Sequence, residues 1–209
     1  MSYFPFFREI EGEKCLVIGG GKVAARKISR LKEFGVKIKV VAPSIVSDIE
    51  AMAQACDNIS VERRIITPQD IENADFVIAA AGEEADKEAA RLCKERSIPV
   101  NVVDNQELCD FIFPSIIRKG DMVAGFVTGG KSPHVAAKIR RDCEMNISDN
   151  IEDILDYLAR IRKLAKDRIS DERKRAAYIR EVSEFCMKAD RVCSNKEENA
   201  FLQKYLDNR

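Results

Sequence analysis

The stretch KCLVIGGGKVAARK, from Lys14 to Lys27, constrains the fold of this chain more than any other feature of its sequence. Four apolar residues lead directly into three glycines, and an alanine-rich, basic segment with helical periodicity follows. Gly19, Gly21 and Ala24 match the pattern G-x-G-x-x-A, whose glycines let a pyrophosphate approach the backbone at a helix N-terminus. We therefore expect a strand, a tight turn and a helix that bind a dinucleotide. A glycine-rich turn without a ligand is the alternative.

Further apolar runs alternate with helical patterns up to about residue 113. The segments that predict strands are 15–19, 36–43, 59–65, 75–81 and 98–103, and those that predict helices are 22–34, 45–55 and 84–96. Strands that are apolar along most of their length, each separated from the next by a helix, are typical of a parallel sheet buried on both faces. The sequence thus predicts an α/β domain with a Rossmann-like, doubly wound parallel sheet over residues 1–113.

The pattern changes after this domain. Residues 111–130 predict two strands around the turn Lys119–Asp121 rather than a crossover helix. Ser132 as an N-cap and Pro133 at the first helical position predict the start of a helix. We therefore expect a small α+β segment over residues 114–149.

From Asn150 onward, apolar residues recur at the spacing of amphipathic helices. A first helix follows Asn150, and further helical patterns cover residues 171–189 and 195–206. The sequence predicts a C-terminal helical domain over residues 150–209.

The end of the second predicted strand does not identify the cofactor. NAD-binding domains usually carry an Asp or Glu there, about 20 residues beyond the glycines, which hydrogen-bonds to the ribose. Residues 40–44 read VVAPS, with no acid for the ribose and no arginine for a 2′-phosphate. Backbone groups or Ser44 would have to bind the ribose, so these residues leave the choice between NAD and NADP open.

Asp104 follows directly after the last predicted parallel strand. Ligands of doubly wound sheets bind outside the carboxyl ends of the strands, so a carboxylate here would face a bound nicotinamide. It could accept a proton while a hydride leaves the same substrate. The alternative is a turn or helix-cap aspartate, a role for which this residue type is also common.

Residues 118–141 contain six basic residues against a single acid, Asp121, and the only histidine of the chain, His134, lies among them. Hydroxyl groups and glycines precede the predicted helix start, where anions are favoured. This segment fits a substrate with several carboxylates. A solvated helix face is the alternative, as is a structural role for the histidine. The candidate substrate-binding residues are Arg118, Thr128, Gly129, Lys131, Ser132 and His134.

Composition bears on the class of protein. Lys and Arg number 35, as do Asp and Glu, so the net charge gives no indication of a nucleic-acid partner. No apolar run approaches the roughly 18 residues of a membrane span, and the N-terminus lacks the pattern of a signal peptide. Seven scattered cysteines, never spaced CxxC, favour reduced thiols over a disulfide framework or a metal site. We expect a cytoplasmic protein that binds neither nucleic acid nor membrane and has no metal site of its own.

Four stretches together resemble a known family. They are FPFF near the N-terminus, the glycine stretch, VVAPS at 40–44, and the long run from Asn101 to Asp142. These stretches are similar to precorrin-2 dehydrogenases, which also form the N-terminal dehydrogenase/ferrochelatase part of siroheme synthases. The resemblance is strong over residues 1–145, and it covers 150–209 only as a helical tail of suitable length.

The resemblance implies NAD-dependent oxidation of precorrin-2 to sirohydrochlorin and, in some family members, insertion of Fe²⁺ to give sirohaem. The family's catalytic aspartate falls on Asp104. Its cofactor contacts fall on Gly21, Lys22 and Val23, and on Pro43 and Ser44, and we include Ala42 beside Pro43 among the candidate cofactor-binding residues. The family also forms homodimers with interlocked central regions, which would make 114–149 a dimerisation and substrate segment. Some members have a phosphorylatable serine where this chain has Thr128.

Two other functions remain open at this point. One is an NAD(H)-sensing regulatory module without catalysis, which would need the glycine-rich turn but neither the carboxylate nor the basic segment. The other is a sirohydrochlorin ferrochelatase without dehydrogenase activity. This sequence ends before any methyltransferase domain, so we expect that these residues do not themselves make precorrin-2 from uroporphyrinogen III.

Overall fold

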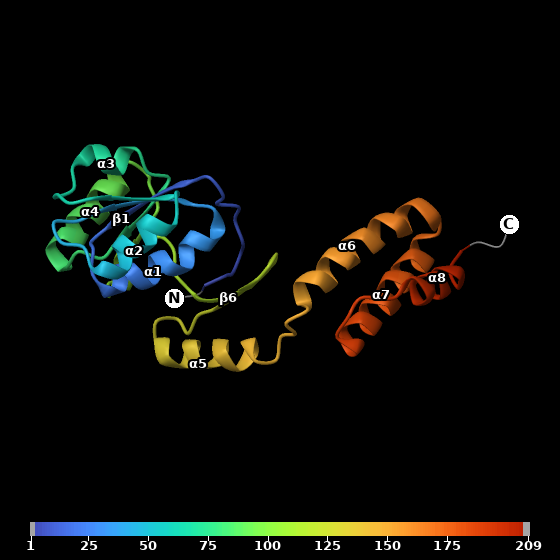
Figure 1. Cartoon of the computed structure of the whole chain (residues 1–209). Helices are drawn as coiled ribbons and strands as arrows, with labels where there is room; N and C mark the ends of the chain where they lie inside the picture. Colours follow the sequence, from blue (N-terminus) through green and yellow to red (C-terminus); the bar gives the residue numbers. More distant parts are fainter. Residues whose placement is uncertain (1–2, 207–209) are drawn as a thin grey trace. The chain divides into compact units, whose positions relative to one another are not determined.

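The computed structural model describes residues 3–206 (Figure 1). Its first part consists of β1 (Lys14–Ile18), α1 (Lys22–Leu31), the 3-10 helix η1 (Lys32–Phe34), β2 (Lys37–Val41), α2 (Ser47–Ala55), β3 (Ile59–Glu62), α3 (Pro68–Glu72), β4 (Phe76–Ala79), α4 (Glu83–Glu95), β5 (Val100–Val102) and the 3-10 helix η2 (Gln106–Leu108). Then follow β6 (Ser115–Lys119), β7 (Met122–Phe126), α5 (Pro133–Glu144), α6 (Ile151–Arg168), α7 (Glu172–Ala189) and α8 (Asn195–Gln203). Every predicted strand and helix is present, together with α3, which was not predicted.

Five parallel strands form one sheet in the order β3-β2-β1-β4-β5. The central strand is β1, where Val17 pairs with Val40 of β2 and with Ile78 of β4. All four apolar residues of β1 are at most 2% exposed, as expected for a strand that is covered on both faces. The prediction of a doubly wound, Rossmann-like sheet is confirmed.

Helices cover both faces of the sheet (Figure 1). On one face, odd-numbered residues of β1 pack against α1 and α2, where Ile28 and Ile49 are completely buried. On the other face, even-numbered residues of β1 pack against α3 and α4, where Ile71 and Cys93 are completely buried. Each large apolar side chain buried in this way contributes about 1.5–3 kcal/mol, so the two clusters hold the strand ends in fixed positions.

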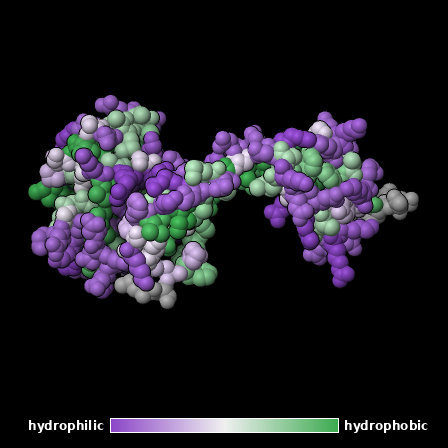
Figure 2. Space-filling view, turned by 90° about the horizontal axis from the view of Figure 1, so that it is seen from below, coloured by the Kyte–Doolittle hydropathy of each residue, from purple (hydrophilic) through white to green (hydrophobic). Residues whose placement is uncertain are grey.

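The described residues form two compact units. One reaches to Pro114 and includes Gly129–Lys131, and the other contains Ser115–Thr128 and the chain from Ser132 onward. In the second unit, β6 and β7 form an antiparallel hairpin, and α6, α7 and α8 enclose an apolar cluster around the fully buried Tyr178. Figure 2 shows a largely hydrophilic surface over these C-terminal helices. Within the described residues, no helix has the length and apolar content needed to cross a bilayer.

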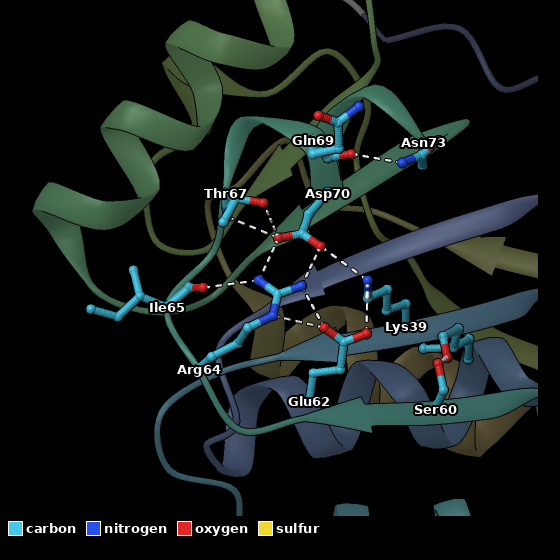
Figure 3. Close-up of polar contacts among 10 residues, drawn as sticks. Lys39, Ser60, Glu62, Arg64, Ile65, Thr67, Gln69, Asp70 and Asn73 are labelled. Carbon is cyan, nitrogen blue, oxygen red and sulfur yellow. Dashed lines mark hydrogen bonds and ion pairs between the residues drawn. The ribbon is translucent and has the colours of Figure 1, made fainter.

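The strand β3 ends at Glu62, earlier than predicted, because Arg64 turns away to bind α3. Its guanidinium donates two hydrogen bonds to the Asp70 carboxylate, at 2.7 and 2.6 Å (Figure 3). The backbone N–H of Thr67 and the ammonium of Lys39 also donate to this carboxylate, at 2.8 and 3.0 Å. The side chain of Asp70 is only 4% exposed. The hydrogen bonds with Arg64 outweigh the effect of burial and lower the pKa of Asp70. The network of hydrogen bonds around this carboxylate joins β2, the end of β3 and α3.

We expect Asp70→Asn to lower the free energy of unfolding at neutral pH by about 2 kcal/mol, because charge-assisted hydrogen bonds to a buried carboxylate are lost. Urea unfolding at several pH values measures this effect. Since the pKa of Asp70 is lowered in the folded protein, its contribution is present above the ordinary carboxyl pKa of about 4 and is lost as the pH falls below it. The difference between wild type and variant should therefore shrink in acid.

The control for this measurement is Glu84→Gln, which changes a carboxylate that is 95% exposed. This change should leave the unfolding curve as it is in the wild type. Equal effects of the two substitutions would show that the buried network does not stabilise the fold.

Candidate nucleotide-binding and active site

The glycine turn after β1 lies between the turns that follow β2 and β4, at the carboxyl edge of the sheet. The N–H of Gly19 donates to the carbonyl of Val41 at 3.1 Å, and the carbonyl of Gly20 accepts from the N–H of Val46 at 2.9 Å. Strand order reverses at this point, because β2 lies on one side of β1 and β4 on the other. Doubly wound sheets bind their ligands where the order reverses.

The three glycines of this turn differ in what a side chain at each position would meet. Gly19 has a φ of +111°, and a Cβ there would lie 2.2 Å from the carbonyl oxygen of Ala80. A Cβ on Gly20 would lie 2.2 Å from the carbonyl oxygen of Ser44. Gly21 has an ordinary φ of −87°, and a Cβ there would meet no atom within 4 Å. Packing therefore explains the first two glycines, whereas the third leaves open space over the backbone that a phosphate group would fill.

The first turn of α1 is suited to an anion. Gly21 is its N-cap and no side chain caps the helix, so the first backbone N–H groups, including those of Lys22 and Val23, have no acceptor within the helix. Of the α-helices in the described part of the chain, only α1 and α5 have no acidic residue in the first turn. The cationic Lys22 is unfavourable at the positive end of a helix dipole unless an anion binds there.

The turn after β2 places its residues next to the glycines without supplying a charge. Ala42 is buried, whereas Pro43 and Ser44 are exposed. The hydroxyl of Ser44 has no hydrogen-bond partner among residues 3–206 and is available for a ribose. Of the two arginines that follow β3, Arg63 forms an ion pair with Glu50, and the guanidinium of Arg64 is held by the network of Figure 3. Neither of them is a free partner for a 2′-phosphate.

The turn after β4 contains functional candidates that the sequence analysis missed. Gly82 has a φ of +116°, and a Cβ there would meet nothing within 4 Å. The buried carboxylate of Asp86 accepts hydrogen bonds from the N–H groups of Ala81 and Gly82, at 2.8 and 3.3 Å. Burial raises the pKa of Asp86. A second glycine with open space above its backbone thus borders the site, and the carboxylate of an acid four residues later holds it in place. The spacing from Gly82 to Asp86 was the signal in the sequence that could have indicated this turn.

Asp104 lies just beyond β5, in a turn with a φ of +59°. Its side chain is exposed, and no described residue donates a hydrogen bond to its carboxylate. The left-handed backbone favours Asn or Asp over most residues. This left-handed conformation does not explain why the residue is Asp rather than Asn. Because within residues 3–206 the carboxylate caps no helix and has no hydrogen-bonded partner, its two oxygens are available to a ligand.

The basic segment is only partly available to a substrate. Thr128 donates a hydrogen bond to the carbonyl of Ser132 at 2.9 Å, and the Ser132 hydroxyl accepts one from the N–H of Val135. Both hydroxyls therefore stabilise the start of α5. Arg118 donates to the carbonyl of Gly120 at 3.3 Å.

Three other cations of this segment pair with acids that lie beyond residue 141. The ion pairs are Lys119–Asp149, Lys138–Asp142 and Arg140–Glu144. Lys131 and His134 are exposed, and Gly129 has a left-handed φ of +62°. Gly129 and Lys131 belong to the first compact unit, whereas Arg118, Thr128, Ser132 and His134 belong to the second. The structure contains no group of three or more His, Cys, Asp or Glu side chains within residues 3–206 that could hold a metal ion.

Comparison with known sequences identifies similar proteins. Residues 6–115 match a family described as "Putative NAD(P)-binding". A siroheme synthase from Nitrosococcus oceani is 31% identical over 201 residues, which cover 96% of this chain and 42% of that protein. One from Nitrosomonas eutropha is 33% identical over 207 residues, covering 99% and 43%, and one from Thioalkalivibrio sulfidiphilus is 36% identical over 179 residues, covering 85% and 36%. This chain spans less than half the length of these relatives.

Comparison with solved structures gives a match along almost the whole chain. The structure of SirC, a precorrin-2 dehydrogenase, aligns with a TM-score of 0.71 over 97% of this chain and 98% of that chain, at 20% sequence identity. At this identity the likeness establishes the fold, including the hairpin and the C-terminal helices. The resemblance seen in the sequence is confirmed by matches in both sequence and structure.

Proposed function

Because this chain belongs to the family of NAD(P)-binding proteins that its residues 6–115 match, we propose that it is a precorrin-2 dehydrogenase, which oxidises precorrin-2 to sirohydrochlorin with NAD⁺. The observation that carries this proposal is the pairing of two features at one edge of the sheet. One is the open, acid-free start of α1. The other is the carboxylate of Asp104, just beyond a strand of the same sheet, to which no residue in the described part of the chain donates a hydrogen bond.

The residues of the site fit a nicotinamide dinucleotide. The N–H groups of Lys22 and Val23 would bind its diphosphate above Gly21, and Ala42, Pro43 and Ser44 would line the ribose beside Gly19. When bound, this cofactor supplies the acceptor for a hydride. Asp104 would take the proton that leaves the tetrapyrrole, because its carboxylate is exposed and has no hydrogen-bond donor of its own within residues 3–206.

We propose NAD rather than NADP as the cofactor. A 2′-phosphate is usually bound by an arginine near the end of the second strand, and residues 40–44 contain none. The arginines that follow β3 are already paired with Glu50, Glu62 and Asp70, so recruiting either of them would break an existing ion pair. A ribose with free hydroxyls requires only backbone groups and Ser44.

The carboxylates of the substrate require cationic and polar partners. We propose Arg118, Thr128, Gly129, Lys131, Ser132 and His134 for this role. We further propose that residues 114–149 serve dimerisation and substrate binding, between a cofactor domain over 1–113 and a helical domain over 150–209. The proposal is supported by the apolar side chains of Val127, Val135 and Ile139, which are 43–47% exposed on this segment and would be covered in a homodimer.

The proposed function is tested by supplying anaerobic precorrin-2 with NAD⁺, NADP⁺ or no nucleotide, each with and without Fe²⁺. We expect NADH absorbance to rise together with the spectrum of sirohydrochlorin, and NAD⁺ to be preferred over NADP⁺ by at least roughly tenfold in kcat/KM. Insertion of Fe²⁺ into separately supplied sirohydrochlorin, together with no NADH formed from precorrin-2, would indicate a ferrochelatase only. Binding of NAD(H) with no turnover of the tetrapyrrole would indicate a sensing module and would contradict the proposal.

A further inference from the structure

The thiol of Cys109 contacts the backbone on both sides of the turn that contains Asp104. Its sulfur accepts a hydrogen bond from the N–H of Val102 at 3.2 Å. Its S–H is shared between the carbonyl oxygens of Val102 and Asn105, which lie 3.2 and 3.3 Å from Sγ. Val102 is the last residue of β5, and Asn105 follows Asp104 directly. One side chain therefore joins the chain before Asp104 to the chain after it.

Part of this arrangement is explained by the edge of the sheet. β5 is an outermost strand, and the N–H of Val103 donates to the carbonyl of Ala79 on β4 at 2.9 Å. Val102, one residue earlier, therefore directs its backbone groups away from β4. Cys109 supplies the partners that these groups need. Satisfying Val102 does not require the contact with Asn105, which reaches across the turn.

The sulfur is itself held in a fixed position. The side-chain nitrogen of Asn101 lies 3.6 Å from it and also donates to the carbonyl of Phe111 at 2.9 Å. The side-chain oxygen of Asn101 accepts a hydrogen bond from the ammonium of Lys27 on α1, at 2.8 Å, and Asn101 is only 5% exposed. These bonds connect the thiol to β5 and α1, so Cys109 can restrain the turn instead of moving with it.

The turn at Asp104 depends on such a restraint. Its φ of +59° lies in the left-handed region, which is unfavourable for residues other than glycine. The carboxylate is exposed and receives no hydrogen bond from any described residue, so the backbone alone sets its direction. Burial raises the pKa of the Cys109 thiol. The thiol therefore keeps its proton at neutral pH and can donate it to a carbonyl oxygen.

We propose that Cys109 is a positioning residue of the dehydrogenase: its thiol, bonded to Val102 and Asn105, fixes the turn that directs the Asp104 carboxylate toward the bound nicotinamide. This inference rests on the proposed function. Proton transfer requires an exact geometry, and a displacement of about 1 Å can lower a rate roughly a hundredfold. Loss of the thiol should therefore lower kcat, whereas the binding of NAD⁺ at the start of α1 should be unchanged.

Two substitutions test the hydrogen bonds of the thiol. Cys109→Ser keeps a donor and an acceptor, whereas Cys109→Ala removes both. We expect Cys109→Ala to lower kcat roughly tenfold to a hundredfold, with the Kd for NAD⁺ within roughly twofold of wild type. Cys109→Ser should retain kcat within roughly threefold, because its hydroxyl replaces the lost bonds. The control is Cys56→Ala, at another half-buried cysteine, which should lower stability by a similar amount without lowering kcat.

A second readout does not depend on turnover. NMR relaxation of the backbone amides in the full chain gives the order parameter of Asp104, which is about 0.85 for a rigid backbone and below about 0.6 for a flexible one. We expect a rigid Asp104 in the wild type and in Cys109→Ser, and a flexible one in Cys109→Ala.

Three results would overturn the inference. They are a wild-type kcat in Cys109→Ala, an unchanged order parameter of Asp104 in that variant, and equal losses of kcat in Cys109→Ala and Cys109→Ser. If the wild type fails to oxidise precorrin-2, the proposed function fails, while the order parameter still decides whether the thiol fixes the turn.

Discussion

Replacing Asp104 with asparagine should lower the rate of precorrin-2 oxidation by roughly a thousandfold, because removal of a general base typically costs two to four orders of magnitude. Asparagine tolerates the left-handed conformation of this position, whose φ is +59°. The substitution therefore removes the proton acceptor without straining the turn. Stopped-flow absorbance of NADH under anaerobic conditions measures the rate.

Two controls show whether the loss in Asp104→Asn is chemical. The affinity for NAD⁺, measured by calorimetry, should stay within roughly twofold of wild type, because no proposed diphosphate contact involves this side chain. Asp110→Asn alters a nearby carboxylate that accepts a hydrogen bond from the N–H of Val100 at 3.0 Å. This control should cost stability rather than lower kcat. An Asp104→Asn variant with the wild-type rate would remove this residue from the mechanism.

Gly21→Val should abolish binding of NAD⁺ while leaving the fold intact. A Cβ at Gly21 meets no protein atom within 4 Å, and its φ of −87° is compatible with valine. We expect the unfolding free energy to fall by no more than about 1 kcal/mol, the usual range for an N-cap change. The added side chain would occupy the space through which a diphosphate reaches the helix, so Kd should rise at least roughly a hundredfold, or about 2.7 kcal/mol.

Gly20→Ala is the matched comparison in the same turn, because it should lower the stability of the fold, which Gly21→Val should leave nearly unchanged. The added methyl group would lie 2.2 Å from the carbonyl oxygen of Ser44 and 2.9 Å from Ile45, so the turn must shift and the protein should be destabilised by several kcal/mol. Thermal unfolding and NAD⁺ calorimetry on both variants separate the two effects. If Gly21→Val binds NAD⁺ as well as wild type does, the diphosphate does not lie over this turn.

The sequence predicted the fold well because its signals are local. The near-continuous apolar strands, the glycine turn and the start of α5 at Ser132 and Pro133 each depend on neighbouring residues only. The helix α3 was missed because five residues are too short for a periodic pattern. Its capping box of Thr67 and Asp70, with Pro68 at the first helical position, was the signal available.

The candidate site was predicted only where a motif or a resemblance supplied it. The need for glycine at position 20 depends on Ser44, which the fold brings close. The bond between Lys27 and Asn101 joins residues 74 positions apart, and no spacing rule indicates such a contact. The ion pair between Lys138 and Asp142 could have been predicted from the sequence, because the two residues lie four positions apart on one helix.

A crystal structure of the protein with NAD⁺ bound tests the central claim most directly. We predict diphosphate oxygens within hydrogen-bonding distance of the N–H groups of Lys22 and Val23, above Gly21, with the nicotinamide ring facing the Asp104 carboxylate. A dinucleotide bound away from the first turn of α1, or an Asp104 side chain directed away from the ring, would contradict it.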